Sequence, residues 1–394
     1  MTPTLDLGDL GLDAGGSVLL ARELRRLPAG GVLAVRGRSP ELGVHLRGWC
    51  RAEGHGFAEA GDGGGWRVTR GWAEDARWRG APRAAGPHGG VVERPPSTWG
   101  LAARGAKVEQ GGPAFPFALD RRDVVWSGSA AAIYRQAAAN QWDPATAVPW
   151  TEPFGLPDDV EEAVVQVMTY LIENENAALA VPARFLGQVH PHFREVVQAL
   201  AVQIADEARH VEVFTRRAGL RGSQPGLSTV GGQSSLLTLL EEPDYAVAHF
   251  LLSVLGEGTF LPLLAFIETH GPDPVTRRVA HLALADEGRH VAFGMAHMEE
   301  VLAADPGLRP RLAAAIRRRH DALADTAGLN ADVFDALVVL AAGSWAPEAI
   351  ARGYAAVGFL QEEMAAGRRR RLVKLGFPPE EAAELSALHT RNFM

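Results

Sequence analysis

The chain has 394 residues, of which 47% are hydrophobic and 22% charged; this composition excludes a disordered or collagen-like chain and allows two or three domains. Its net charge of −8 argues against nucleic acid as the main partner. We interpret the short basic runs 317–320 and 368–371 as solvated helix faces. A single cysteine, Cys50, cannot form an internal disulfide or a cysteine-based metal site, so we expect a reducing, cytoplasmic location.

The N-terminal residues lack a basic segment followed by an apolar one, so we expect no signal peptide. The longest apolar stretch, 250–267, is interrupted by two glycines, a glutamate and a proline. It therefore predicts a buried helix rather than a membrane span, and we expect no membrane partner.

Residues 1–70 predict a small α/β domain. Apolar residues at helical spacing indicate helices over 18–27 and 40–54, and a strand-length apolar run covers 32–35. Short strands at 55–60 and 66–69 flank a glycine-rich turn. With a short strand before Val18, the element order is β-α-β-α-β-β.

This domain resembles the small sulfur-carrier domains of the TusA/SirA type, in its element order and in the sequences LPAGGVLAV and WCRAEGHGF. That family carries sulfur on the thiolate of a Cys-Pro pair just before its first helix. Here the corresponding stretch, 12–16, reads LDAGG, and Cys50 lies instead on the second helix. We therefore expect a docking or structural role for the domain, without sulfur transfer.

Residues 71–155 are rich in Gly, Pro and Trp and predict an irregular connector. So many apolar anchors are not typical of a free linker, and we expect them to pack against the domain that follows. The six tryptophans are Trp72, Trp78, Trp99, Trp126, Trp142 and Trp150.

Helical patterns dominate from residue 156 onward. Helices over 158–189, 192–217, 243–269 and 272–303, with a Gly/Ser/Pro-rich crossover at 222–235, predict a four-helix bundle spanning 156–305. Helices over 309–323, 331–342, 346–375 (broken at Gly367) and 379–391 form a C-terminal extension, 306–394. The predicted fold is mainly α: a ferritin-like four-helix bundle with extra C-terminal helices, preceded by a small α/β domain.

One short motif occurs twice in the bundle, as DEARH at 206–210 and DEGRH at 286–290. Each copy places a Glu and a His one turn apart on one helix face. The partner helix of each hairpin offers a further Glu, which is Glu257 in the second hairpin. In the first hairpin we choose Glu175, because the apolar stripe of the helix runs through that position; Glu173, on a wetter face, remains the alternative.

Glu, Glu-x-x-His, Glu, Glu-x-x-His on four helices is the pattern of di-iron and di-manganese carboxylate bundles. The carboxylates carry a charge of about −4, which balances two divalent ions, and their oxygens suit iron or manganese. We predict two iron ions, with manganese as the alternative at one or both positions, and no catalytic residue or organic cofactor beyond this centre. The predicted ligands are Glu175, Glu207, His210, Glu257, Glu287 and His290.

The neighbours of the ligands are repeated too. A metal-bound His usually donates its other N–H to a carboxylate, so we expect Asp286 to hold His210 and Asp206 to hold His290 across the bundle. Arg209 and Arg289 are expected to balance the acidic shell.

At these residues the chain resembles the ferritin-like di-iron carboxylate superfamily, and the doubled Asp-Glu-x-Arg-His is especially similar to hydroxylase subunits of bacterial multicomponent monooxygenases. The resemblance covers 158–303 and implies two irons joined by bridging carboxylates, O2 activation and oxidation of an organic substrate. Leu261 departs from the Thr that those hydroxylases often carry, and Phe214 from the Tyr of the radical-forming subunit of ribonucleotide reductase.

We therefore expect a non-haem di-iron oxygenase or oxidase that uses O2 to oxidise a small organic substrate, with an external electron donor protein or reductant. The alternatives are a di-metal enzyme that removes peroxide or superoxide, and a non-catalytic metal store. Gly256 and Gly258, beside Glu257, make room either for substrate or for close helix packing. The sequence leaves open whether the chain forms a homodimer.

Overall fold

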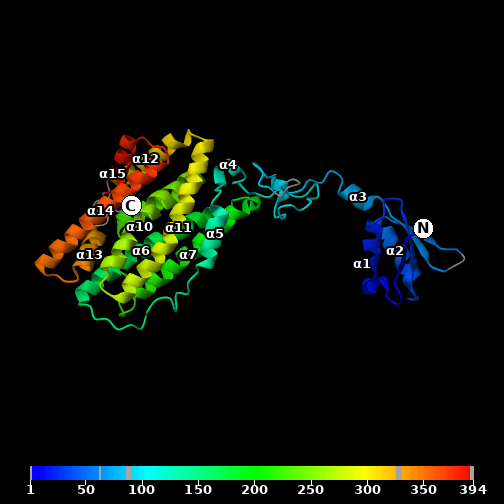
Figure 1. The fold of residues 1–394 in the computed structure, drawn as a ribbon, viewed down its shortest axis with the longest axis horizontal. Coiled ribbons are helices and arrows are strands. Elements are labelled where there is room, and N and C mark those ends of the chain that lie inside the picture. Colours follow the sequence, from blue (N-terminus) through cyan, green and yellow to red (C-terminus); the bar gives the residue numbers. More distant parts are fainter. Residues whose placement is uncertain (1, 62–63, 86–89, 325–330, 391–394) are drawn as a thin grey trace. The chain divides into compact units, whose positions relative to one another are not determined.

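A four-stranded sheet organises the N-terminal unit of the chain, residues 1–89 and 102–112 (Figure 1). The computed structural model describes residues 2–61, 64–85, 90–324 and 331–390. Strands β1 (Thr4–Asp6), β2 (Val32–Arg36), β3 (Gly56–Glu59) and β4 (Trp66–Thr69) lie in the order β1-β2-β4-β3, with β1 and β2 parallel and the other pairs antiparallel. With helices α1 (Ser17–Arg25) and α2 (Leu42–Glu53), the predicted order β-α-β-α-β-β is confirmed.

The core of this unit lies between its two helices and the sheet. Leu33 and Val35 are two residues apart on β2 and so point to the same face of the sheet. Helices α1 and α2 pack their apolar side chains against this face. Cys50 belongs to this core and is 1% exposed, and its burial raises the pKa of the thiol to about 11. A thiol in such surroundings is a packing residue rather than a nucleophile.

The segment predicted as an irregular connector contains more helix than expected. A short helix, α3 (Ala73–Arg77), belongs to the N-terminal unit, while α4 (Arg122–Val125) and α5 (Ala130–Ala139) belong to the second unit, residues 90–101 and 113–394. Helix α5 packs against α7 of the bundle. Its sequence, AAAIYRQAAA, explains the helix, because Ala has the highest helix propensity. The Gly, Pro and Trp content of the whole segment obscured this local signal.

Two helical hairpins form the bundle of the second unit (Figure 1). Helix α6 (Asp158–Leu186) pairs with α7 (Arg194–Ala218), and a rod made of α9 (Tyr245–His249), η4 (Phe250–Gly256) and α10 (Glu257–His270) pairs with α11 (Pro274–Ala304). Pro274 in the first turn and the Asp273 side chain, which accepts from the Thr276 N–H at 2.8 Å, fix the start of α11. The predicted four-helix bundle is confirmed.

Two segments of the bundle differ from their predicted form. The third rod is not one α-helix: η4 is a π-helix, and Glu257 begins the α-helix that follows it. The crossover is not irregular throughout, because α8 (Val230–Glu241) begins within it and continues beyond its predicted end at 235. The Thr229 hydroxyl accepts from the Gly232 N–H at 3.0 Å and caps the N-terminus of α8.

The C-terminal extension consists of α12 (Leu308–Ala324), α13 (Ala331–Ala342), α14 (Pro347–Lys374) and α15 (Pro379–Thr390). Helix α14 continues through Gly367, so the predicted break there is wrong. The last helix was predicted to end at Arg391, which lies outside the described residues. The basic runs are not wholly solvated either, since Arg319 and Arg368 are buried. Four consecutive helical residues span a full turn, so one side of each run must face the protein.

Among the described residues, the rod Tyr245–His270 is long and apolar enough to cross a membrane, but 78% of its apolar window is buried inside the structure. Helices α13 and α14 pass the same test only as a pair bent by 119°. Burial of this extent is typical of a core helix.

Candidate metal centre

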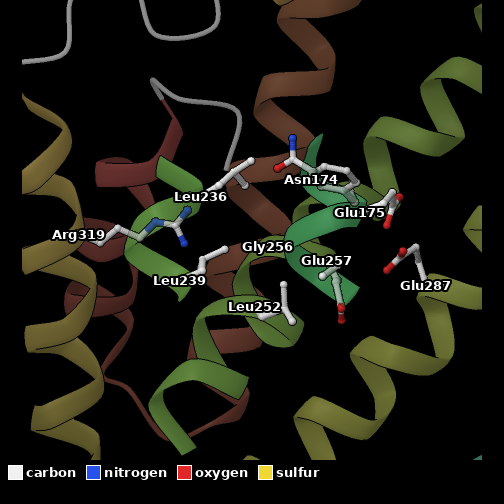
Figure 2. Close-up of a pocket in the computed structure, with 11 residues that line it drawn as sticks. Asn174, Glu175, Leu236, Leu239, Leu252, Gly256, Glu257, Glu287 and Arg319 are labelled. Atoms are coloured by element: carbon white, nitrogen blue, oxygen red, sulfur yellow. The ribbon is translucent and has the colours of Figure 1, made fainter. Parts of the chain in front are cut away.

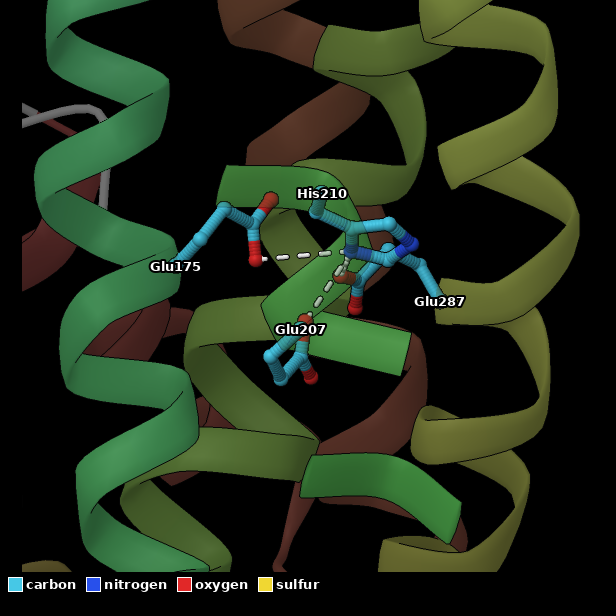
Figure 3. A group of neighbouring side chains, drawn as sticks. All are labelled: Glu175, Glu207, His210 and Glu287. Carbon is cyan, nitrogen blue, oxygen red and sulfur yellow. Dashed lines mark hydrogen bonds and ion pairs between the residues drawn. The ribbon is translucent and has the colours of Figure 1, made fainter. Parts of the chain in front are cut away.

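Four helices bring the six predicted ligands together in two overlapping groups. Figure 3 shows four of them: Glu175, Glu207, His210 and Glu287. Helix α6 supplies Glu175, α7 and α11 each supply a Glu and a His one turn apart, and α10 supplies Glu257 as its first residue. Every one of these side chains is buried, with at most 4% exposed. Each of these residues belongs to the buried positions of its helix, so packing of the four helices brings them together.

The donor atoms form two overlapping sets, and within each set all of them lie within 4.8 Å of one another. The first set is Glu175, Glu207, His210 and Glu287, and the second is Glu207, Glu257, Glu287 and His290. Glu207 and Glu287 belong to both sets. If two cations were bound, each of these two carboxylates would be within reach of both.

Both imidazoles turn Nδ1 toward the shared carboxylates. His210 Nδ1 lies 3.0 Å from Glu207 Oε2 and 3.4 Å from Glu287 Oε1. His290 Nδ1 lies 2.9 Å from Glu207 Oε1 and 3.5 Å from Glu287 Oε2. The two imidazoles are thus placed in similar ways beside the shared pair. Figure 3 shows the first set.

Glu173 does not belong to either set. It is half-buried and lies toward the crossover: its Oε2 is 3.9 Å from the place that a Cβ on Gly232 would occupy. Two residues along a helix correspond to a rotation of about 200°, so Glu173 and Glu175 cannot face the same point.

The outer nitrogen of each imidazole meets an aspartate of the other hairpin. His210 Nε2 lies 3.2 Å from Asp286 Oδ2, and His290 Nε2 lies 3.2 Å from Asp206 Oδ2. A carboxylate accepts from the ring N–H, which leaves Nδ1 of each His as the nitrogen available to a metal. Arg209 and Arg289 each contact both aspartates.

In the part of the chain that the structure describes, hydrogen bonds from Trp142, Gln141 and Gln203 to the centre were not predicted from the sequence. Trp142 Nε1 donates to Asp286 Oδ2 at 2.8 Å, and Gln141 Nε2 donates to Asp206 Oδ1 at 3.0 Å. On α7, Gln203 Nε2 donates to Glu257 Oε1 at 2.8 Å. Gln203 lies one turn before Glu207 and was detectable by its spacing, whereas the other two lie in a segment with no periodicity to read.

The buried carboxylates of the centre carry negative charge that bound cations would balance. Burial, together with Glu207 and Glu287, raises the pKa of Glu175 well above its usual value, and burial raises that of Glu257 in the same way. Burial alone would lower the pKa of His210, but Asp286, Glu175 and Glu207 raise it well above its usual value. Within the described chain, Glu175 Oε1, Glu257 Oε2 and Glu287 Oε2 have no hydrogen-bond partner. Buried carboxylate oxygens of this kind, with two imidazoles, fit a dinuclear iron or manganese site.

An apolar cavity adjoins the carboxylates (Figure 2). Leu236 and Leu239 of α8 and Leu252 of η4 lie between Arg319 at one end and the glutamates at the other. Its volume of about 30 Å³ holds one or two waters in the state seen. Gly256 lines this cavity, whereas a Cβ on Gly258 would lie 2.5 Å from the Arg371 guanidinium, so the first glycine makes room beside the centre and the second makes room for packing.

No family model matches the chain, and no curated protein matches it. Solved structures do match in part. An R2-like ligand-binding oxidase with an aerobically reconstituted Mn/Fe cofactor is 20% identical over 63% of this chain and 93% of its own, with a TM-score of 0.47. An R2-like ligand-binding oxidase with an aerobically reconstituted metal cofactor after photoconversion is 19% identical over 63% and 94%, with a TM-score of 0.46. Similarity at this level assigns the chain to no family.

Proposed function

We propose that this protein is a non-haem dinuclear iron enzyme, with manganese as the alternative at either position, that uses O2 to oxidise a small organic substrate. The observation that carries the proposal is the pair of four-donor sets sharing Glu207 and Glu287. Two ferrous ions held there would supply electrons to O2, and an external reductant would restore them.

The protein's own residues would perform three tasks. Four glutamates neutralise the cations and two histidines complete their coordination. Asp206 and Asp286 keep each imidazole in one orientation by accepting from its outer N–H. The leucines of the adjoining cavity keep bulk water from the carboxylates and offer an apolar surface to a substrate.

Iron loading under anaerobic conditions tests the proposal. We expect the metal content to approach two per chain, and O2 uptake by the loaded, reduced protein to rise when an oxidisable substrate is added. Glu287→Ala should lose both irons, because this carboxylate serves both sets. Saturation at one iron per chain would contradict the dinuclear centre, and rapid disproportionation of peroxide without substrate would favour a detoxifying enzyme instead.

A further inference from the structure

The two halves of the centre share their Asp, Glu, Arg and His but differ one turn earlier. Gln203 stands four residues before Glu207, and Ala283 stands four residues before Glu287. Positions four apart share a helix face, so both residues face the interior beside the ligands. Both are fully enclosed, with Gln203 2% and Ala283 0% exposed. The internal symmetry of the site is therefore broken next to the ligands.

The Gln203 amide hydrogen-bonds to Glu257, whereas in the described part of the chain it makes no such bond to Glu175, the equivalent residue of the first set. Its Nε2 donates to Glu257 Oε1 at 2.8 Å, while Glu257 Oε2 has no hydrogen-bond partner among the described residues and is left for a cation. Glu175 holds the equivalent place in the first set. Its Oε2 lies 3.6 Å from His210 Nδ1, and its Oε1 has no hydrogen-bond partner within the described ranges.

We propose that Gln203 is a positioning residue that fixes Glu257 as a ligand through one oxygen, and so makes the position of Glu257 and His290 the tighter of two unequal metal positions. This role, which rests on the proposed function, follows from preorganisation. A carboxylate already held by a buried N–H donor loses little freedom when a metal arrives, whereas Glu175 must be ordered by the metal. The donor is neutral, so it orients Glu257 without cancelling its charge.

The test is anaerobic titration of metal-free protein with Fe(II) against a competing chelator, with Mössbauer spectra of protein that holds one equivalent of iron. The wild-type protein should bind in two resolved steps and show one main iron environment at one equivalent. Gln203→Met keeps the length and packing of the side chain but removes the amide. We expect its tighter step to weaken roughly 10–100-fold, as for other groups that orient metal ligands, and its first iron to divide between two environments.

Two further variants separate positioning from packing. Gln203→Ala should weaken the same step as Gln203→Met, because both lack the donor. Gln188→Met removes an amide whose one hydrogen bond among the described residues goes to the Arg184 carbonyl, at 2.9 Å, and should titrate like wild type. Thermal unfolding of the metal-free proteins accompanies each titration, because lost packing alone lowers the melting temperature without changing the two iron steps.

The outcomes are distinct. If Gln203→Met binds iron in the wild-type steps with one main environment, Gln203 is only a core residue and the proposal is wrong. A wild-type protein that fills both positions together overturns the inequality while leaving the dinuclear centre intact. A wild-type protein that binds one iron or none overturns the proposed function and this inference with it.

Discussion

Glu175 and Glu173 carry the same side chain on α6, but they point in directions about 200° apart around the helix axis. Glu175 is 1% exposed and within reach of Glu207, His210 and Glu287, while Glu173 lies toward the crossover on the other side of α6. The choice between the two is thus made by the direction of each side chain from the helix axis, since both carry the same carboxylate.

Alanine at each position should separate them. Glu175→Ala removes one negative charge from a buried centre, so we expect iron in the first set to weaken strongly and O2 uptake to fall with it. Glu173→Ala should resemble wild type, because substitutions outside the core usually change stability by about 0.5 kcal/mol or less. Iron titration and O2 consumption of both variants check this. The reverse ranking would make Glu173 the ligand and leave the dinuclear assignment standing.

The candidate ligands could be predicted from the sequence because their motif repeats. Two copies of Glu-x-x-His, each with a buried Glu on the partner helix, leave few arrangements in which four carboxylates can share an interior. Trp142 and Gln141 were not accessible, because the contacts that bring them to Asp286 and Asp206 link residues far apart in the chain. A segment without periodicity gives no indication of which face it presents.

Helix α11 carries two glycines whose surroundings differ sharply. A Cβ on Gly294 would lie 2.7 Å from the Ser253 Cβ of η4, so this glycine allows the two helices to approach closely. A Cβ on Gly288 would meet nothing within 4 Å. The first motif copy carries Ala208 at the position equivalent to Gly288.

These glycines make a matched pair of alanine variants. Gly294→Ala should destabilise the metal-free protein by about 1–3 kcal/mol, offset in part by the better helix propensity of Ala, because α11 and η4 must move apart. The same movement takes His290 away from Glu257 and should weaken iron binding there. Gly288→Ala should stabilise by up to about 1 kcal/mol and bind iron normally. Thermal unfolding and iron titration measure both effects, and equal behaviour of the two variants would show that α11 and η4 do not constrain each other.

At the scale of elements, apolar periodicity predicted the rods of the bundle but not their internal detail. A π-helix and an α-helix bury the same kinds of residue. The apolar sequence of η4 therefore does not distinguish the one from the other. Helix α8 was missed because glycines and serines at its start read as a loop, although Thr229 is a capping residue.

The whole molecule keeps its only thiol and its candidate metal centre in different units. Cys50 lies in the core of the N-terminal unit, where burial raises the pKa of the thiol from 9.0 to about 11. The folded state therefore holds the thiol proton more tightly than the unfolded state. The resulting stabilisation is complete below pH 9 and is lost as the pH rises through 11.

A chromogenic disulfide reagent tests this placement. Native protein at pH 8 should react very slowly, and guanidinium-unfolded protein should release one equivalent, since the chain has one cysteine. Cys50→Ala should leave iron content and O2 uptake unchanged. Fast stoichiometric labelling of the native protein, or loss of turnover in the variant with iron retained, would assign the thiol a chemical role.

The crossed pairing of the histidines has a consequence for assembly. His210 is oriented by Asp286 and His290 by Asp206, so each hairpin supplies the imidazole of one half and the acceptor of the other. A nascent chain that has formed only its first hairpin has neither half complete, however well that hairpin is folded. Tight iron binding should thus appear only after both hairpins dock. The metal would then stabilise the folded bundle and would not nucleate its folding.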